Sequence, residues 1–330
     1  MKLAEPYVSL IINGVDVGSD LAPSLLDFTF TDNLHGKADE IAVKLLDASG
    51  LWRGPWRPEQ GDMVKAAIGY RGGMVMPCGK FQVDIPRASG SRANEVLNFK
   101  AVSAFPEAEQ RTQRSQGFEN SDLQKIIEEI AKRHGYTVSG DIEPIKFNFK
   151  RQRRERDLQF IRRIAEDYGY FFSIKDKKLV FFKRDELEKQ EPVRTFDIVE
   201  GTQVINWDVQ EKTHNTYSKA QVSYLDPSSK KLIKGEVQDL AAPSGDTLKI
   251  DERVEDEASA KKLAKGRLAK ANEDKRTLNI TVVGDPLLVA GQVIALGSTY
   301  GKFAGNYLTH KATHKLARAN YTTKLEAKGV

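Results

Sequence analysis

Hydrophobic and polar residues alternate in short runs through the first hundred positions of the chain. Leu26, Phe28 and Phe30 are separated by Asp27 and Thr29, which is the two-residue period of a strand with one buried face. Similar short runs, alternating or almost wholly apolar, recur at 7–12, 41–45, 64–68, 81–85 and 96–102. Residues typical of turns separate these runs. Short strands at this spacing favour a barrel or a sandwich over an open α/β sheet.

The pattern changes to a helical period near Gly117. Ser121 and Gln124 have the spacing of a capping box, in which each side chain satisfies a backbone N–H of the other residue. Apolar residues follow at helical spacing as far as Ala131. Gly135 then supplies a left-handed residue that can end the helix.

A second helix and a hairpin follow. Apolar residues line one face over 157–168, and Gly169 ends the pattern. Two apolar runs, 170–174 and 179–182, flank a polar turn and predict a β-hairpin. We therefore expect residues 117–190 to form a small α+β unit.

Strand patterns return from residue 191, interrupted by one helix at about 254–272 with a narrow apolar stripe and a charged opposite face. The expected domains are a first β-barrel at 1–116, the α+β unit at 117–190, and a second β-barrel at 191–330 that includes this helix. The expected fold class is mainly β, with an α+β insertion between two similar barrels.

The two strand-rich regions repeat the same motifs in the same order. Each contains a glycine turn, an apolar strand and a closing glycine, and later the tripeptide Arg-Ala-Asn. The matched positions are 61–69 with 290–297, Phe81 with Tyr307, 92–94 with 318–320, Phe99 with Leu325, and Ala101 with Ala327. Agreement in order and spacing predicts an internal duplication. Three copies of such a chain could present a ring of six similar units.

The composition is that of an ordinary globular protein, with 40% hydrophobic and 29% charged residues among 330 and a net charge of +5. No apolar run approaches the roughly 20 residues of a membrane helix, and the N-terminus lacks a secretory pattern. We therefore expect no membrane anchor and a protein made in the cytoplasm. Cys78 is the only cysteine, which excludes an internal disulfide and a thiolate metal cluster.

No motif predicts catalysis, a cofactor or a metal site. His310 and His314 are four residues apart, but in a predicted strand they would lie about 13 Å apart, too far to share one metal ion. Phosphate-binding loops and nucleophile motifs are absent from the sequence. We expect a protein that is not an enzyme. A hydrolase stays an alternative, because two carboxylates that flank a cleft cannot be located from sequence.

The run 150–156 is the strongest candidate for nucleic-acid contact, because its Lys and Arg residues could neutralise several phosphates. It contains Glu155 and no aromatic residue that could stack on a base. A solvated face or a contact with acidic groups of another subunit is therefore favoured. We expect no specific nucleic-acid binding, and a DNA-binding regulator stays an alternative.

A loop between two predicted strands carries Trp52, Arg53, Trp56 and Arg57. Tryptophan and arginine are favoured anchors of protein interfaces, so these four residues are our candidate partner interface. The alternative is that both indole rings fold back over the end of their own barrel.

Two segments resemble the phage late control gene D family. Arg154–Gly169 is similar to that family's signature helix, and Gly284–Pro286 followed by Ala290–Val293 is similar to its C-terminal block. Together with the order of strands and helices, the resemblance covers nearly the whole chain. The chain ends at Val330, with neither an oligosaccharide-binding domain nor a repetitive needle after the second barrel, which favours a phage-type hub over a fused secretion spike.

The resemblance implies two tail-tube-like barrels in a structural hub at the baseplate of a contractile phage tail or a related injection device. In that role the chain would form a homotrimer, a pseudo-sixfold ring that joins the tail tube protein to the threefold tail spike protein. The tape measure protein and other baseplate proteins are further implied partners. The virion tail would be assembled in the bacterial host cytoplasm. No cofactor is implied, and a cell-wall hydrolase of the tail and a DNA-binding regulator remain the alternatives.

Overall fold

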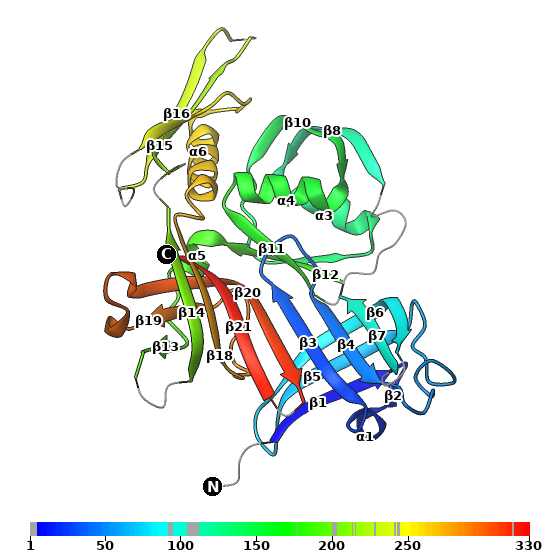
Figure 1. Ribbon diagram of the computed structural model, residues 1–330. Coiled ribbons are helices and arrows are strands. Elements are labelled where there is room, and N and C mark those ends of the chain that lie inside the picture. The colour runs from blue at the N-terminus through cyan, green and yellow to red at the C-terminus, as the bar shows by residue number, and fades with distance from the viewer. Residues whose placement is uncertain are drawn as a thin grey trace.

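The computed structural model describes the whole chain except residues 1–4, 92–94, 104–111, 176, 200–202, 213, 215, 228, 241, 243–244 and 319. Strands dominate it, and most of them belong to one 13-stranded sheet that curls into two barrels (Figure 1). The strand order along the main path of this sheet is β14-β18-β21-β20-β3-β4-β7-β6-β5-β1-β2. The predicted fold class is confirmed.

The first barrel contains most of the strands that alternation predicted. Its elements are β1 (Glu5–Ile12), β2 (Val15–Asp16), α1 (Gly18–Leu21), β3 (Leu25–Asn33), β4 (Glu40–Leu46), β5 (Met63–Arg71), β6 (Val75–Gly90) and β7 (Glu95–Val102). Phe28, Phe81 and Phe99 are fully buried inside it, as the two-residue period requires.

The second barrel contains β13 (Thr195–Phe196), β14 (Val204–Glu211), β18 (Arg276–Val283), β19 (Val293–Leu296), a 3-10 helix (Ser298–Phe303), β20 (Gly305–Ala317) and β21 (Asn320–Gly329). Ile280, Tyr307 and Leu325 fill its core. Strand β20 also pairs antiparallel with β3, so the two barrels share one continuous hydrogen-bonded sheet.

The two barrels repeat the same strand order, β3-β4-β7-β6-β5 in the first and β14-β18-β21-β20-β19 in the second. The register is also repeated. Facing pairs in the first and second barrel are Val64–Phe81 with Ile294–Tyr307, Pro86–Phe99 with Ala312–Leu325, and Phe28–Val43 with Trp207–Ile280. This agreement confirms the duplication and extends it to β3 and β14, where the sequences had given no match.

Even the irregularities recur at matching positions. Each barrel has a bulge in its long strand where that strand pairs with the next strand of the barrel, and another bulge in its first strand. These bulges lie between Val83 and Ile85 in β6, Thr309 and Lys311 in β20, Leu25 and Asp27 in β3, and Val204 and Asn206 in β14. Because a bulge breaks the ladder and bends the strand, its conservation between copies indicates a shared architecture. The tripeptide at 92–94 and Ala319 lie outside the described residues.

The middle of the chain forms a separate layer beside the barrels. It consists of β8 (Gln113–Asp122), α3 (Leu123–Arg133), β9 (Thr137–Ser139), β10 (Lys146–Arg156), α4 (Asp157–Asp167), β11 (Tyr170–Lys175), β12 (Lys178–Lys183) and α5 (Arg184–Glu188). The two helices and the hairpin are where the sequence predicted them. Strands β8 and β10 had not been expected.

The cap of α3 differs from the prediction. Asp122, not Ser121, precedes the helix, and its carboxylate accepts a hydrogen bond of 2.9 Å from the backbone N–H of Lys125. Ser121 is instead the penultimate residue of β8. The predicted box with Gln124 was therefore wrong by one residue, because Asp122 offers a stronger, charged acceptor at the position where the chain turns.

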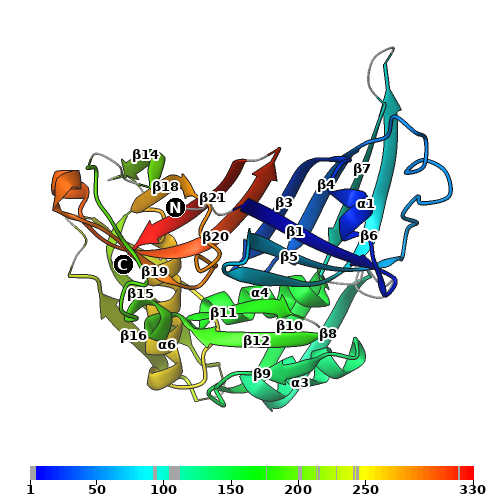
Figure 2. The same ribbon diagram turned by 90° about the horizontal axis from the view of Figure 1, so that it is seen from below.

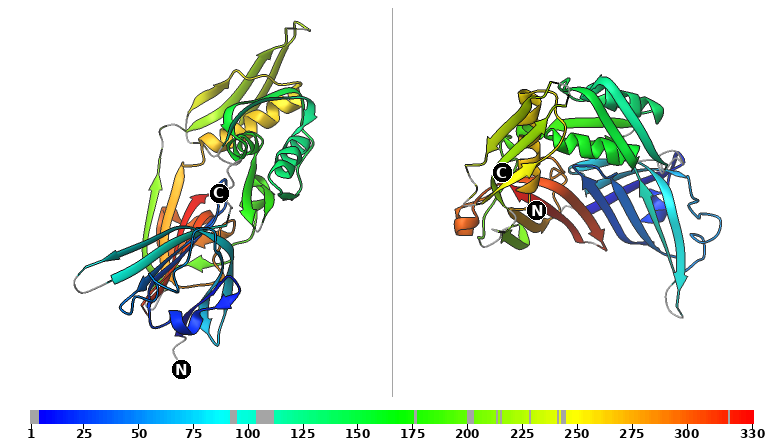
Figure 3. Two further views of the ribbon diagram at one scale, coloured as in Figure 1. Left: turned by 90° about the vertical axis from the view of Figure 1, so that its right-hand side faces the viewer. Right: turned by 90° about the horizontal axis from the view of Figure 1, so that it is seen from above.

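Helix α6 (Glu257–Ala271) also lies elsewhere than expected. It packs, together with β15 (Tyr217–Leu225), β16 (Leu232–Gln238) and β17 (Asp246–Ile250), into the same hydrophobic core as α3 and α4. Gly266 lets the α6 backbone approach α4, because a Cβ there would lie 2.2 Å from the carbonyl oxygen of Asp167. Figure 3 shows this sheet and α6 at the end of the molecule away from the first barrel. This helix therefore shares its core with the elements β8 to α5, the middle unit, and not with the second barrel.

Candidate assembly surfaces

The tryptophan loop is divided between core and surface. Trp52 is only 3% exposed and belongs to the core of the first barrel, whereas Trp56 is 44% exposed. The two rings meet edge to face at 5.5 Å between centroids. Arg53 pairs with Glu95, and both Arg53 and Arg57 lie on the surface. Of the four candidate residues, only Trp52 is hidden within its own barrel.

Buried Asp47 holds this loop in place. Its carboxylate accepts hydrogen bonds of 2.9 Å from the N–H of Trp52 and 3.0 Å from the N–H of Arg53. The loop therefore has a defined conformation that presents Trp56 to solvent.

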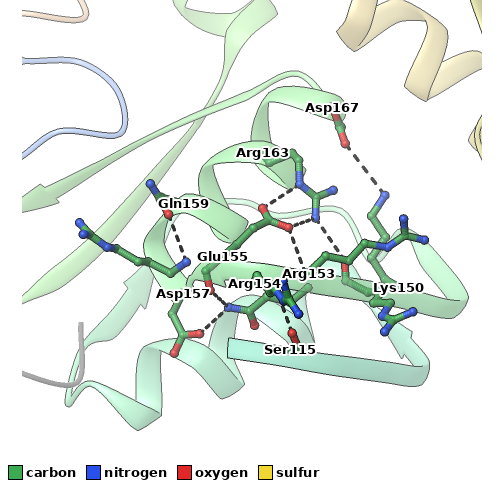
Figure 4. A network of polar contacts seen from close by, with 12 residues as sticks. Ser115, Lys150, Arg153, Arg154, Glu155, Asp157, Gln159, Arg163 and Asp167 are labelled. Carbon is green, nitrogen blue, oxygen red and sulfur yellow. Dashed lines mark hydrogen bonds and ion pairs between the residues drawn. The ribbon is translucent and has the colours of Figure 1, made fainter. Parts of the chain in front are cut away.

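The basic run lies on the second half of β10, where Lys150 and Glu155 have charged partners within the chain (Figure 4). Arg163 of α4 donates two hydrogen bonds to Glu155, at 2.8 and 2.9 Å. Lys150 is buried and bonds to Glu252 at 3.0 Å. Arg151, Arg153, Arg154 and Arg156 remain exposed.

Asp157 anchors the start of α4. It is buried and accepts hydrogen bonds from Gln152 at 2.8 Å and from Arg133 at 2.9 Å, and His134 lies 2.9 Å away. Burial alone would raise its pKa, but the hydrogen bonds from these three side chains outweigh it and hold the pKa of Asp157 below its usual value. Lys150 and Gln152 thus face an internal scaffold, whereas the four arginines of the run lie on the surface.

A buried charge cluster connects β10, α4 and α6. Asp167 lies 4.0 Å from the ammonium of Lys150 and 2.8 Å from the guanidinium of Arg267, which also bonds to Glu252 at 2.9 Å. Burial raises the pKa of Asp167 to about 6 despite these cations. A raised carboxyl pKa can mark a catalytic acid. Here the carboxylate contacts Lys150 and Arg267, and these contacts hold β10, α4 and α6 together.

The two histidines of β20 have separate surroundings. His314 is fully buried, with Nδ1 2.8 Å from the Tyr321 hydroxyl and Nε2 2.8 Å from the carbonyl oxygen of Leu288. His310 occupies the bulge and packs edge-on against Phe171. Burial lowers the pKa of both histidines. In the part of the chain that the structure describes, no group of three or more His, Cys, Asp or Glu is arranged to hold a metal.

Two strand edges were not identified from sequence. Strand β14 ends the sheet and pairs only with β18, and β6 beyond Ile85 pairs only with β7 among the described strands. Figures 1 and 2 place the two edges on opposite sides of the molecule. Exposed apolar residues lie on both, including Ile85 on β6 and Ile205 and Trp207 on β14. Unpaired edges of this kind are templates for pairing with another chain.

The fold of this chain also occurs in a bacterial tail protein and in a component of a secretion system. A tail protein from Neisseria meningitidis MC58 superposes with a TM-score of 0.73 at 16% identity, covering 98% of this chain and 96% of that one. A component of the Escherichia coli type VI secretion system superposes with a TM-score of 0.61 at 13% identity, covering 93% and 74%. These likenesses define the fold class as that of tail and injection-machine proteins.

The sequence then identifies the family. Residues 102–320 match the phage tail baseplate hub (GPD) family, and the chain belongs to it. It is 28% and 30% identical, over 180 residues, to the probable baseplate hub proteins of Escherichia phages 186 and P2. Each alignment covers 54% of this chain and 45% of the relative, so the chain spans about half the length of the curated relatives it matches.

Family membership gives the chain a structural role in the tail baseplate. The predicted resemblance is therefore confirmed. Among the described residues, no helix is long and apolar enough to cross a membrane.

Proposed function

We propose that this chain is the central hub of a contractile tail, a homotrimer whose six barrels form a pseudo-sixfold ring. The ring joins the sixfold tail tube protein on one side to the threefold tail spike protein on the other. The tape measure protein and other baseplate proteins are further partners in the completed tail.

One observation supports this proposal above the others: the two barrels share register and bulges and are already joined edge to edge through β20 and β3. A chain with two equivalent units can match a sixfold partner with three copies, because each copy supplies two of the six positions. A trimer of the same chain also matches a threefold partner, because each of its three copies contacts one subunit of that partner.

The mass of the purified chain in solution tests the proposal, and a threefold mass is expected at high protein concentration. Peptidoglycan hydrolysis and DNA binding across a salt series are measured on the same sample. Hydrolysis by the purified chain would instead favour the hydrolase. A monomer or dimer whose DNA affinity falls steeply with salt would favour the regulator.

A further inference from the structure

The joint between the two barrels within the chain is a template for a joint between chains. In the internal joint, β20 of the second barrel pairs antiparallel with β3 of the first, from Lys311–Asn33 to Ala317–Asp27. The duplication makes β6 the counterpart of β20 and β14 the counterpart of β3. These two counterparts are the exposed edges described above.

Burial differs between counterparts in the way that a missing partner strand would cause. Phe28 on β3 is fully buried beneath the joint, whereas its counterpart Trp207 on β14 is 39% exposed. His314 and Leu316 on β20 are buried, but their counterparts on β6, Ala88 and Gly90, are exposed. The same positions are covered in one barrel and open in the other.

The backbone groups of the open β14 edge point toward the missing strand. The N–H of Lys212 donates to the carbonyl oxygen of Lys275, on the side of β18. Because successive residues of a strand point their N–H and C=O groups to opposite sides, those of Val209 and Glu211 point away from β18. In the internal joint, the N–H of Leu34 donates to the carbonyl oxygen of His310. Every second residue of β20 from His310 onward therefore directs its backbone N–H and C=O toward β3.

We infer that β6 of one chain pairs antiparallel with β14 of a second copy of this chain, in the register of the internal joint. This inference rests on the proposed function, because it supplies the contact that closes the ring. The facing pairs are Ile85 with Lys212, Pro86 with Glu211, Arg87 with Gln210, Ala88 with Val209, Ser89 with Asp208, and Gly90 with Trp207 of the second copy. Pro86 has no N–H to donate, so this joint has one hydrogen bond fewer than its template.

The contact is head to tail, because the two edges differ. Each chain offers one β6 edge and one β14 edge, so successive copies add with the same rotation until the ring closes. The internal joint and the contact between chains would then alternate around the ring.

Cysteine pairs test the register directly. Ser89 and Asp208 face each other as a pair that is not hydrogen-bonded, in which the Cα atoms are about 4.5 Å apart, within disulfide range. Oxidation of the Ser89→Cys, Asp208→Cys double variant should give species of two and three covalently linked chains on a non-reducing gel. Wild-type chain is a suitable background, since Cys78 is buried and burial raises the pKa of its thiol.

Two controls separate register from proximity. Thr29→Cys with Lys315→Cys is the same pair in the internal joint and should link within one chain, without an increase in mass. Ser89→Cys with Gln210→Cys is shifted by two residues and should give mainly single chains. A threefold mass with linkage through the shifted pair, or with no linkage, would overturn this joint and leave the hub trimer standing. A monomer at every concentration, with no linkage, would overturn both.

Discussion

His35 of the first barrel donates its Nε2–H to the carboxylate of Glu166 on α4, at 3.0 Å. The proton lies on Nε2 because Nδ1 accepts a hydrogen bond of 3.0 Å from the N–H of Phe172. Glu166 also accepts from Arg162 at 2.9 Å and pairs with Lys270 of α6. This carboxylate therefore ties the first barrel to the middle unit.

Replacing this carboxylate should weaken the subunit and change its response to acid. Burial alone would raise the pKa of Glu166, but the hydrogen bonds from His35, Lys270 and Arg162 outweigh it and lower the pKa. A carboxyl group whose pKa is lower in the folded state stabilises the protein at pH values above its usual pKa of 4.5. That contribution is lost as the pH falls through the folded-state pKa. We expect Glu166→Gln to lower the free energy of unfolding by about 1–3 kcal/mol at neutral pH.

Urea unfolding across pH checks this prediction, with exposed Glu128→Gln as the control. The Glu166→Gln variant should lose less stability than wild type between neutral and acid pH. If the free energies of unfolding of wild type and of Glu166→Gln changed in parallel with pH, the prediction would be contradicted.

The tryptophan loop predicts opposite effects for its two indoles. Trp52→Ala removes a buried core side chain and should cost about 3–5 kcal/mol of subunit stability. We propose that the exposed Trp56, with Arg53 and Arg57, contacts a partner, so Trp56→Ala should leave the melting temperature of the monomer nearly unchanged. Trimerisation or docking to the tube should weaken instead, by about 2 kcal/mol if Trp56 is an anchor. Mass and tube binding that match wild type would reject the interface.

Asp167 predicts a dependence of stability on pH that is opposite in sign to that of Glu166. Its pKa is raised to about 6, so the folded state binds the proton more tightly than the unfolded state, whose carboxyl has the usual value of 3.8. The resulting stability is present in acid and is lost as pH rises from about 4 through 6. Asp167→Asn cannot ionise, so its stability relative to wild type should improve by about 2 kcal/mol over that interval. A constant difference between pH 4 and 7 would show that Asp167 does not titrate there.

Two neighbours in the basic run should respond differently to loss of charge. Lys150→Met removes one of the two cations that Asp167 and Glu252 share, the other being Arg267, and breaking a buried pair costs about 3–5 kcal/mol. The side chain of Arg151 is exposed, and Arg151→Ser should change stability by less than about 0.5 kcal/mol. Chemical denaturation compares the two, and equal effects would reject the internal-scaffold role.

Local patterns predicted what local forces determine. The periods around Phe28, Phe81 and Phe99 identified strands with one buried face, and Gly135 and Gly169 marked the ends of helices, where both have positive φ. The duplication was visible because its glycine turns and strand spacings were retained. It could not be seen in β3 and β14, because counterpart residues differ there, as Phe28 and Trp207 do, and the first is covered whereas the second is exposed.

Features set by distant partners were not predictable in the same way. The run at 150–156 reads as a charged surface, and its four arginines are exposed, but nothing local shows that Glu252 and Asp167 will surround Lys150. Trp52 likewise resembles an exposed loop residue until Asp47 turns the chain back toward the barrel. The stripe on α6 shows that one face is buried, but not which core receives it. In each case the deciding contact is far away in sequence.

The covalent link between the two barrels also affects how copies meet. Strands β20 and β3 find each other at an effective concentration set by the length of the chain and independent of how much protein the cell has made. In the proposed six-unit ring, half of the strand joints would thereby form during folding, before any encounter between molecules. The folded subunit then has two unlike open edges, so copies that add through those edges as proposed would share one orientation and would turn the same face toward the tube.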